Sequence, residues 1–273
     1  MSFLKVLPEE VKEKLQDAVR RAQYLMGIGG GSDVLTSGEQ SIFDVLALEC
    51  QPPYCIFDVG ANKGQFLNLA LNTLSGNDLS IHCFEPAKES FRILSNRKSD
   101  SRIILNNIGI SKKNGMMTLF YDKPDSAIAS LTKRRLDHFG IYFNKSETIQ
   151  VKTIDNYFET NHIERINLLK VDVEGHELDV FAGAENTFGK GKIDIATFEF
   201  GGCNIDTRTF FQDFWYFFSD VNMKLFRITP SGYLCPIRAY DEIDEQFRPT
   251  NFIALQNKGK INNTVKGADD AIL

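Results

Sequence analysis

The chain has 273 residues, enough for one large domain or for a domain with an appendage, and its 42% hydrophobic content excludes the disordered class. A net charge of -5 argues against a general nucleic-acid partner, and no apolar run approaches the roughly 20 residues of a membrane span. Five cysteines without a C-x-x-C spacing favour reduced thiols over disulfides or zinc. We therefore expect a cytoplasmic protein.

The first fifty residues read as a helical appendage. Apolar residues recur with a 3.6-residue period through residues 1–26, with Pro8 near the start, which predicts an amphipathic helix. Glycines at 27–31 break it, and a second helical pattern runs from about Ser41 to Leu48. We interpret residues 1–50 as structural cover for the main domain, as a cap over an active site, or as a contact between copies in a homo-oligomer.

From Tyr54 onward, apolar runs alternate with helical patterns, which is typical of an α/β domain with a largely parallel sheet. We place this domain at residues 51–258 and a polar tail at 259–273. The expected strands are Tyr54–Val59, Leu79–Phe84, Arg102–Asn107, Ile166–Val171, Ile193–Phe200, Lys224–Ile228 and Asn251–Leu255, with shorter strands at Met116–Tyr121 and Thr148–Thr153 in an insertion. Helices are expected near 63–74, 88–97, 176–188 and 209–218.

A glycine-spaced turn follows the first of these strands. It reads Asp58-x-Gly60-x-x-x-Gly64, which differs from both the dinucleotide fingerprint and the phosphate loop. Glu85 ends the next strand, where a carboxylate suits a ribose diol. Together the two features suggest a nucleoside cofactor without a pyrophosphate, and S-adenosylmethionine fits that description. A nicotinamide-dependent dehydrogenase on a similar sheet is the alternative, against which the missing pyrophosphate site counts.

Further polar residues fall at predicted strand ends, where an open parallel sheet collects its ligands. The string Asp172-Val173-Glu174-Gly175-His176-Glu177 follows the fourth strand, and Glu199 ends the fifth. With the glycine turn and Phe84-Glu85-Pro86, these motifs resemble the FkbM family of S-adenosylmethionine-dependent methyltransferases over about residues 54–256. The string after the fourth strand is the specific part of this resemblance.

The resemblance implies a class I methyltransferase core, with a Rossmann-like seven-stranded sheet covered by helices on both faces. It also implies methyl transfer to oxygen, on a hydroxyl of a saccharide, a glycan or a secondary metabolite. A non-catalytic binding module that keeps the fold is a further alternative. The residues that the family pattern assigns to the cofactor are Asp58, Gly60, Ala61, Asn62, Gly64, Glu85, Asn107 and Asp172. Asn107 would contact the adenine, although Asn106 is an alternative as the inward-facing member of the pair.

A hydroxyl acceptor needs a base to remove its proton. Asp172, Glu174, His176 and Glu199 lie at the same strand-end rim, and a histidine has the pKa best matched to proton transfer near neutrality. In a metal-assisted variant, Asp172, Glu199 and Asn204 would supply oxygen ligands for Mg²⁺.

The acceptor side is expected in the insertion and in residues 203–218. Aromatic rings stack on sugars, and arginines bind carboxylates or phosphates. The substrate-binding candidates are Tyr121, Ser130, Arg134 and Glu199. The phenylalanine-rich stretch at 209–218 is better explained, for most of its rings, as the buried stripe of a helix.

Overall fold

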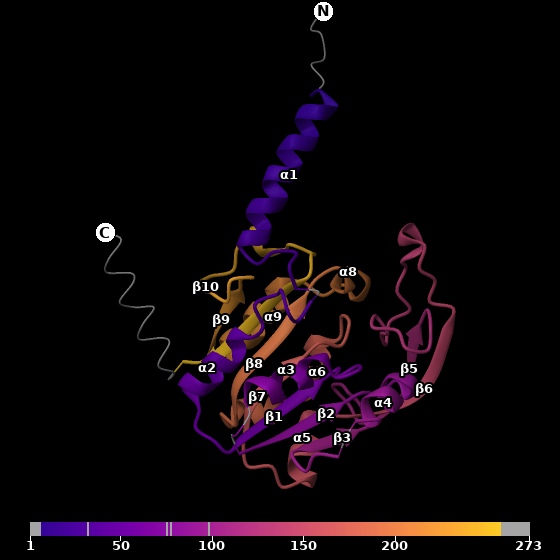
Figure 1. The fold of residues 1–273 in the computed structure, drawn as a ribbon, viewed down its shortest axis with the longest axis vertical. Helices are drawn as coiled ribbons and strands as arrows, with labels where there is room; N and C mark the ends of the chain where they lie inside the picture. Colours follow the sequence, from indigo (N-terminus) through magenta and orange to yellow (C-terminus); the bar gives the residue numbers. More distant parts are fainter. Residues whose placement is uncertain (1–6, 32, 75, 77, 98, 258–273) are drawn as a thin grey trace, which may run out of the picture.

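The computed structural model describes residues 7–257 except 32, 75, 77 and 98. The predicted tail at 259–273 lies outside the described residues. The body is a central sheet with helices on both faces, and the helix α1 (Glu9–Leu25) extends from it (Figure 1).

The central sheet has the strand order β10-β9-β11-β8-β7-β1-β2-β3. Its strands are β1 (Tyr54–Val59), β2 (Leu79–Phe84), β3 (Ile103–Asn106), β7 (Ile166–Val171), β8 (Ile193–Phe200), β9 (Met223–Ile228), β10 (Leu234–Ile237) and β11 (Thr250–Gln256). The five strands β3, β2, β1, β7 and β8 run parallel to one another, whereas β11 runs antiparallel to both β8 and β9. The mostly parallel sheet is thus confirmed, and its strand order reverses between β1 and β7.

The sheet has eight strands, so the expected number of seven is wrong. The additional strand β10 pairs antiparallel with β9 at the edge of the sheet. Its four residues include Pro236, which lacks a backbone donor and is tolerated only at such an edge. So short a segment forms a strand because β9 provides a partner, and its own sequence gives little sign of it.

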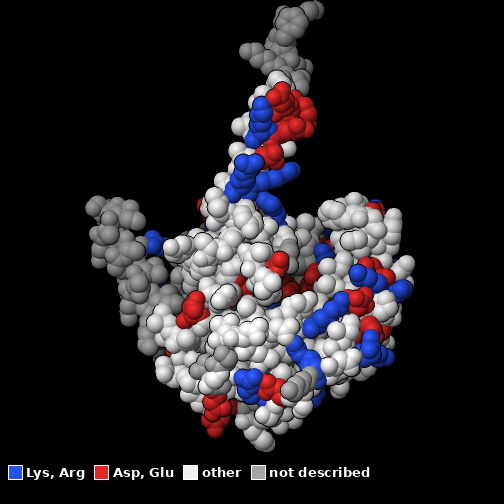
Figure 2. Space-filling view, in the orientation of Figure 1, with Lys and Arg blue, Asp and Glu red and all other residues white. Residues whose placement is uncertain are grey.

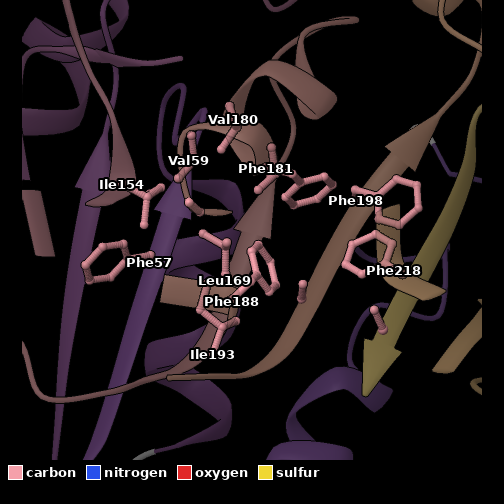
Figure 3. Packing of buried hydrophobic residues seen from close by; sticks show 14 of the residues in the cluster. Phe57, Val59, Ile154, Leu169, Val180, Phe181, Phe188, Ile193, Phe198 and Phe218 are labelled. Atoms are coloured by element: carbon pink, nitrogen blue, oxygen red, sulfur yellow. The ribbon is translucent and has the colours of Figure 1, made fainter. Parts of the chain in front are cut away.

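Two hydrophobic clusters cover the faces of the sheet. The helices on one face are α2 (Ser41–Glu49), α3 (Gln65–Thr73) and α4 (Lys88–Ser95), and those on the other are α5 (Ile154–Thr160), α6 (Glu177–Ala182), α7 (Glu185–Gly189) and α9 (Phe211–Asp220). Figure 3 shows the second cluster, in which Phe198 of β8 lies beside Phe181 and Phe218. In the phenylalanine-rich helix α9, Phe211, Phe214 and Phe218 are buried, as expected, while Phe210 just before it is exposed.

The insertion forms a separate three-stranded sheet of β4 (Gly109–Ile110), β6 (Lys145–Lys152) and β5 (Gly115–Tyr121). The helix expected at 176–188 is divided into α6 and α7, and two short helices were not expected, α5 and α8 (Cys203–Thr207). The division falls at Gly183, where a Cβ atom would lie 2.3 Å from the Ser111 carbonyl oxygen. The approach of this distant backbone is a tertiary contact, which a helical period in the sequence cannot reveal.

The two N-terminal helices differ in their packing. Ile42, Phe43 and Leu46 of α2 are buried under the sheet, whereas no residue of α1 is buried. The glycine-rich segment between them lies against the end of β9, because a Cβ atom on Gly27 would come within 2.2 Å of the Ile228 carbonyl oxygen. The sequence division at residue 50 therefore stays a prediction, with α2 part of the main core. Among the described helices, none is long and apolar enough to cross a membrane.

Candidate functional site

A cavity of about 930 Å³ opens at the carboxyl ends of β1, β2, β7 and β8, beside the point where the strand order reverses. This is where an open parallel sheet binds its ligands. Further walls come from residues 31 and 33–39 before the sheet, residues 126–139 of the insertion, and residues 247–251 at the start of β11. Figure 2 shows acidic side chains in the hollow of the molecular surface below α1.

The glycine turn after β1 is held close to the end of β7. Gly60 has a φ of +81°, and a Cβ atom there would lie 1.8 Å from the Asp172 carbonyl oxygen. Gly60 is therefore required by the approach of the two strand ends as well as by its backbone conformation. Gly64 caps α3 with a φ of +88°. Gly60, Ala61 and Asn62 line the cavity, whereas Gly64 is not part of its wall.

Glu85 follows β2 and lies 7% exposed in the cavity wall. Its Oε2 accepts a hydrogen bond from the Asn62 backbone N–H and its Oε1 one from the Ala87 N–H, both 2.8 Å long. Burial raises the pKa of Glu85 to about 7, although these hydrogen bonds favour the carboxylate. Each oxygen has a second lone pair, so the carboxylate can still accept hydrogen bonds from a diol.

A buried lysine connects the acidic strand ends. Lys170 of β7 is 6% exposed, and its Nζ lies 3.3 Å from Asp58 Oδ1, 3.5 Å from Asp172 Oδ2 and 3.2 Å from the Gly60 carbonyl oxygen. Asp58 itself is fully buried, does not line the cavity, and has no hydrogen bond of good geometry within the described structure. Burial raises the pKa of Asp58, and Lys170 opposes this shift. Asp58 therefore acts on the cavity through Lys170.

Two carboxylates, those of Glu174 and Glu177, hold the loop after β7 in place. Glu177 is 1% exposed, and its Oε1 accepts hydrogen bonds from the Val173 and Gly175 backbone N–H groups. Glu174 has a φ of +57° and forms an ion pair with Arg134 of the insertion at 2.5 Å. Burial and the neighbouring Asp172 raise the pKa of Glu174. Arg134 thus attaches the insertion to the loop that follows β7.

Both ring nitrogens of His176 have a partner. Nδ1 lies 3.0 Å from Asp179 Oδ2, and Nε2 lies 3.0 Å from the Thr132 hydroxyl of the insertion. The His176 side chain is only 15% exposed. This arrangement connects α6 to the insertion and leaves neither nitrogen free to face an acceptor in the cavity.

Glu199, at the end of β8, lines the cavity and has no ion pair or side-chain hydrogen bond with any residue that the structure describes. Burial, followed by the negative charges of Asp172 and Glu174, raises the pKa of Glu199 well above its ordinary value. Asp172 also lines the cavity, and its side chain is 45% exposed. These two carboxylates are the predicted catalytic groups that remain available to an acceptor.

Four other predicted site residues lie outside the cavity wall. The Asn107 amide donates to the Glu85 and Pro86 carbonyl oxygens, and Ser130 is 1% exposed and donates to the Glu174 carbonyl oxygen. Tyr121 packs against the small cluster of the insertion. Asn204 is fully buried, and its Oδ1 accepts the Gly201 N–H at 2.8 Å. Its side-chain oxygen is therefore used within its own loop, unlike the other two proposed Mg²⁺ ligands, Asp172 and Glu199.

No group of three or more His, Cys, Asp and Glu side chains within the described part of the chain is arranged to hold a metal ion. Asp172 instead has Lys170 as its cationic neighbour. The metal-assisted variant stays a prediction from the sequence.

Among the described residues, sequence reasoning missed four charged residues that line the cavity, namely Asp33, Glu39, Lys170 and Arg248. Lys170 was visible as the one basic residue in the apolar strand Ile166–Val171, a signal that could have identified it. Glu39 lines the cavity at 7% exposure, but it stands in a polar turn before α2. The turn that holds it is placed by the contacts of Gly27 and Gly38 with Ile228 and Thr229 at the end of β9, so no local pattern could have found it.

Comparison with known proteins gives a consistent result. The family described as "Methyltransferase FkbM domain" matches residues 58–228. Hexuronic acid methyltransferase AglP of Haloferax volcanii is 28% identical over 151 residues, which are 55% of this chain and 57% of that protein. 31-O-demethyl-FK506 methyltransferase FkbM of Streptomyces tacrolimicus is 30% identical over 165 residues, or 51% of this chain and 62% of that protein.

The chain therefore spans only about three fifths of the length of these relatives. Among solved structures, methyltransferase FkbM from Methylobacillus flagellatus is 14% identical, with a TM-score of 0.45 over 90% of this chain and 60% of that chain. The family match and the strand order together confirm the expected class I methyltransferase fold.

Proposed function

Because the chain belongs to the FkbM methyltransferase domain family, we propose that it transfers a methyl group from S-adenosylmethionine to a hydroxyl of a saccharide or other metabolite. The observation that carries this proposal is that Glu85, Asp172 and Glu199, at the carboxyl ends of β2, β7 and β8, all line one cavity. The cavity volume of about 930 Å³ lies within the usual range for small-molecule sites.

The residues fit the cofactor. Glu85, buried with only backbone donors, is placed to accept hydrogen bonds from a ribose diol, and the backbone of Gly60 to Asn62 lines the adjoining wall. When bound, S-adenosylmethionine would supply an electrophilic methyl group, from which an acceptor oxygen would displace the thioether sulfur in line. The work of the protein is then to align the acceptor and to remove its proton.

Glu199 is our candidate for the general base. A base works best when its pKa lies near the operating pH, and burial with neighbouring carboxylates raises the pKa of Glu199 from the ordinary acidic range. His176 is the weaker candidate because Asp179 and Thr132 occupy its two nitrogens. Asp172, next to Lys170 and opposite Gly60, is assigned to positioning the acceptor hydroxyl.

The charge of the cavity favours a neutral acceptor. Of the residues that the structure describes, six acidic side chains line it against three lysines and arginines: Asp33, Glu39, Glu85, Asp172, Glu174 and Glu199 against Arg134, Lys170 and Arg248. Two of the basic groups already have acidic partners, since Arg134 pairs with Glu174 and Asp206, and Lys170 with Asp58 and Asp172. An anionic acceptor would therefore meet uncompensated negative charge.

The test is a panel of nucleotide sugars, glycosides and glycans with a labelled methyl donor, with and without EDTA. We expect label in an ether of a neutral sugar, and a higher kcat/KM for a glycoside than for the matching uronic acid. A preference for the uronic acid would overturn the neutral acceptor. Thermal stabilisation by NAD but not by S-adenosylhomocysteine would favour the dehydrogenase alternative, and cofactor binding without turnover would favour a binding module.

A further inference from the structure

The segment before the sheet contributes a carboxylate to the cavity. Glu39 lies outside the part of the chain that matches the family, yet it is 7% exposed and lines the cavity. Its Oε2 accepts a hydrogen bond of 2.8 Å from the Ser37 hydroxyl. Within the described residues, no lysine, arginine or histidine forms an ion pair with it. A buried carboxylate in such surroundings carries a desolvation cost that a bound cation would offset.

The position of Glu39 relative to the strand ends identifies the cation. Its charged neighbours are Lys170, Asp172 and Asp58, which belong to the ends of β1 and β7, whereas Glu85 stands at the end of β2. With the ribose of S-adenosylmethionine at Glu85, the cavity wall continues along Gly60 to Asn62 after β1 to Asp172 after β7, and this wall is the place left for the amino-acid portion. Of the cationic groups in S-adenosylmethionine, only the ammonium has N–H donors for a carboxylate.

We propose that Glu39 binds the α-ammonium group of the amino-acid portion of S-adenosylmethionine, an inference that rests on the proposed function. Burial raises the pKa of Glu39 to about 7, which agrees with a carboxylate whose cationic partner is supplied by the ligand. The family domain alone would then lack one cofactor contact, which the residues before β1 provide.

The test compares two ligands by titration calorimetry: S-adenosylhomocysteine, and an analogue in which hydrogen replaces its α-amino group. Glu39→Gln should weaken the binding of S-adenosylhomocysteine about tenfold, corresponding to 1.4 kcal/mol. The affinity for the analogue without the α-amino group should change by less than twofold. Asp44→Asn, an exposed acid on the adjoining helix α2, is the matched control and should change neither.

Unchanged affinity for S-adenosylhomocysteine in Glu39→Gln, or equal losses for both ligands, would overturn the inference. A change confined to the KM of the acceptor would also overturn it and assign Glu39 to the acceptor. Failure of the unaltered protein to bind S-adenosylhomocysteine would instead refute the proposed function. Glutamine removes a buried charge, so thermal unfolding without ligand should show an intact fold.

A second, independent observation concerns the surface of α1. Along the described part of this helix, Val11, Leu15 and Val19 are spaced four residues apart and are 43%, 56% and 55% exposed. In proteins most of the stability of a helix comes from packing of its apolar face. Its base is fixed, since the Met26 carbonyl oxygen accepts a 2.8 Å hydrogen bond from Arg227 and Gln23 bonds Gln246 and Arg248. The helix therefore projects from the body, and no other described residue covers its apolar stripe (Figure 1).

The charged residues of α1 indicate which partner would pack against Val11, Leu15 and Val19. Its outer half carries Glu9, Glu10, Glu13 and Asp17 against two lysines, whereas the half next to the body carries only Arg20 and Arg21 (Figure 2). Two copies in antiparallel orientation would place each acidic half beside the arginines of the other. Because the helix has no excess of basic residues, an anionic membrane surface is a poorer match. We propose that α1 pairs antiparallel with α1 of a second copy of the chain.

Sedimentation velocity should show a dimer that Leu15→Glu converts to a monomer. The double variants Glu10→Arg with Glu13→Arg, and Arg20→Glu with Arg21→Glu, should each be largely monomeric alone and form a mixed dimer together. A monomeric unaltered protein, or a mixture that stays monomeric, would refute this pairing. Binding of monomers to phosphatidylserine vesicles would replace it with a membrane contact.

Discussion

Replacing Lys170 with methionine should destabilise the protein by about 3–5 kcal/mol, the usual cost of removing one partner from a buried ion pair. Methionine keeps most of the side-chain volume, so the loss comes from charge. Asp58 is fully buried with Lys170 Nζ at 3.3 Å as its cation, and would be left without a counter-charge. Asp172 loses the same partner, but its side chain is 45% exposed and water can solvate it.

Urea unfolding followed by circular dichroism measures the change, with an unchanged m-value as the condition for comparing midpoints. The double variant Lys170→Met with Asp58→Asn should recover most of the loss, because a neutral amide replaces the unpaired carboxylate. The loss in the single variant should shrink as pH falls, since the buried Asp58 can then bind a proton. A loss below about 1 kcal/mol, or no recovery in the double variant, would refute this account of the strand ends.

Three further predictions concern the site. Glu85→Ala should weaken S-adenosylhomocysteine by about 1–3 kcal/mol in calorimetry, the usual loss for a charge-assisted hydrogen bond, and unchanged affinity would reject its role at the ribose. Glu199→Gln should lower kcat by about 10²–10⁴-fold while cofactor affinity changes little, whereas equal losses in both would indicate a cofactor or folding role. Because the pKa values of Glu39 and Glu85 are raised to about 7 and ligand binding favours their ionised forms, affinity should rise with pH up to about 8 and binding should release protons. Calorimetry in buffers of different ionisation enthalpy measures that release, and a pH-independent Kd with no proton release would contradict it.

The sheet was predictable because its inner strands are continuous apolar runs. β1, β2, β7 and β8 begin and end where the sequence indicated, since strands buried on both faces leave that signal. The edge strand β10 could not be predicted from its four residues, because its pairing with β9 is what makes it a strand. The hydrophobic pattern of a segment indicates which of its residues are buried, but it does not indicate which distant segment packs against them.

The candidate site divides in the same way. The strand-end carboxylates Glu85, Asp172 and Glu199 were identifiable from their positions in the pattern, and all three line the cavity. His176 was attractive for its residue type, but its availability depends on Thr132, which is 44 positions away. Glu39 was invisible for the converse reason, since its burial comes from folding of the N-terminal segment onto the sheet.

The contact between Gly60 and the Asp172 carbonyl oxygen limits how this protein could be adapted to new acceptors. There is room for a hydrogen atom but not for a methyl group between Gly60 and this oxygen. The glycine turn after β1 and the backbone of Asp172 are therefore packed directly against each other. The Asp172 backbone N–H also donates a 3.0 Å hydrogen bond to the Val59 carbonyl oxygen, which holds the two strand ends together. Changes in acceptor range should therefore be sought in the insertion at 126–139 and in residues 31 and 33–39, which also line the cavity.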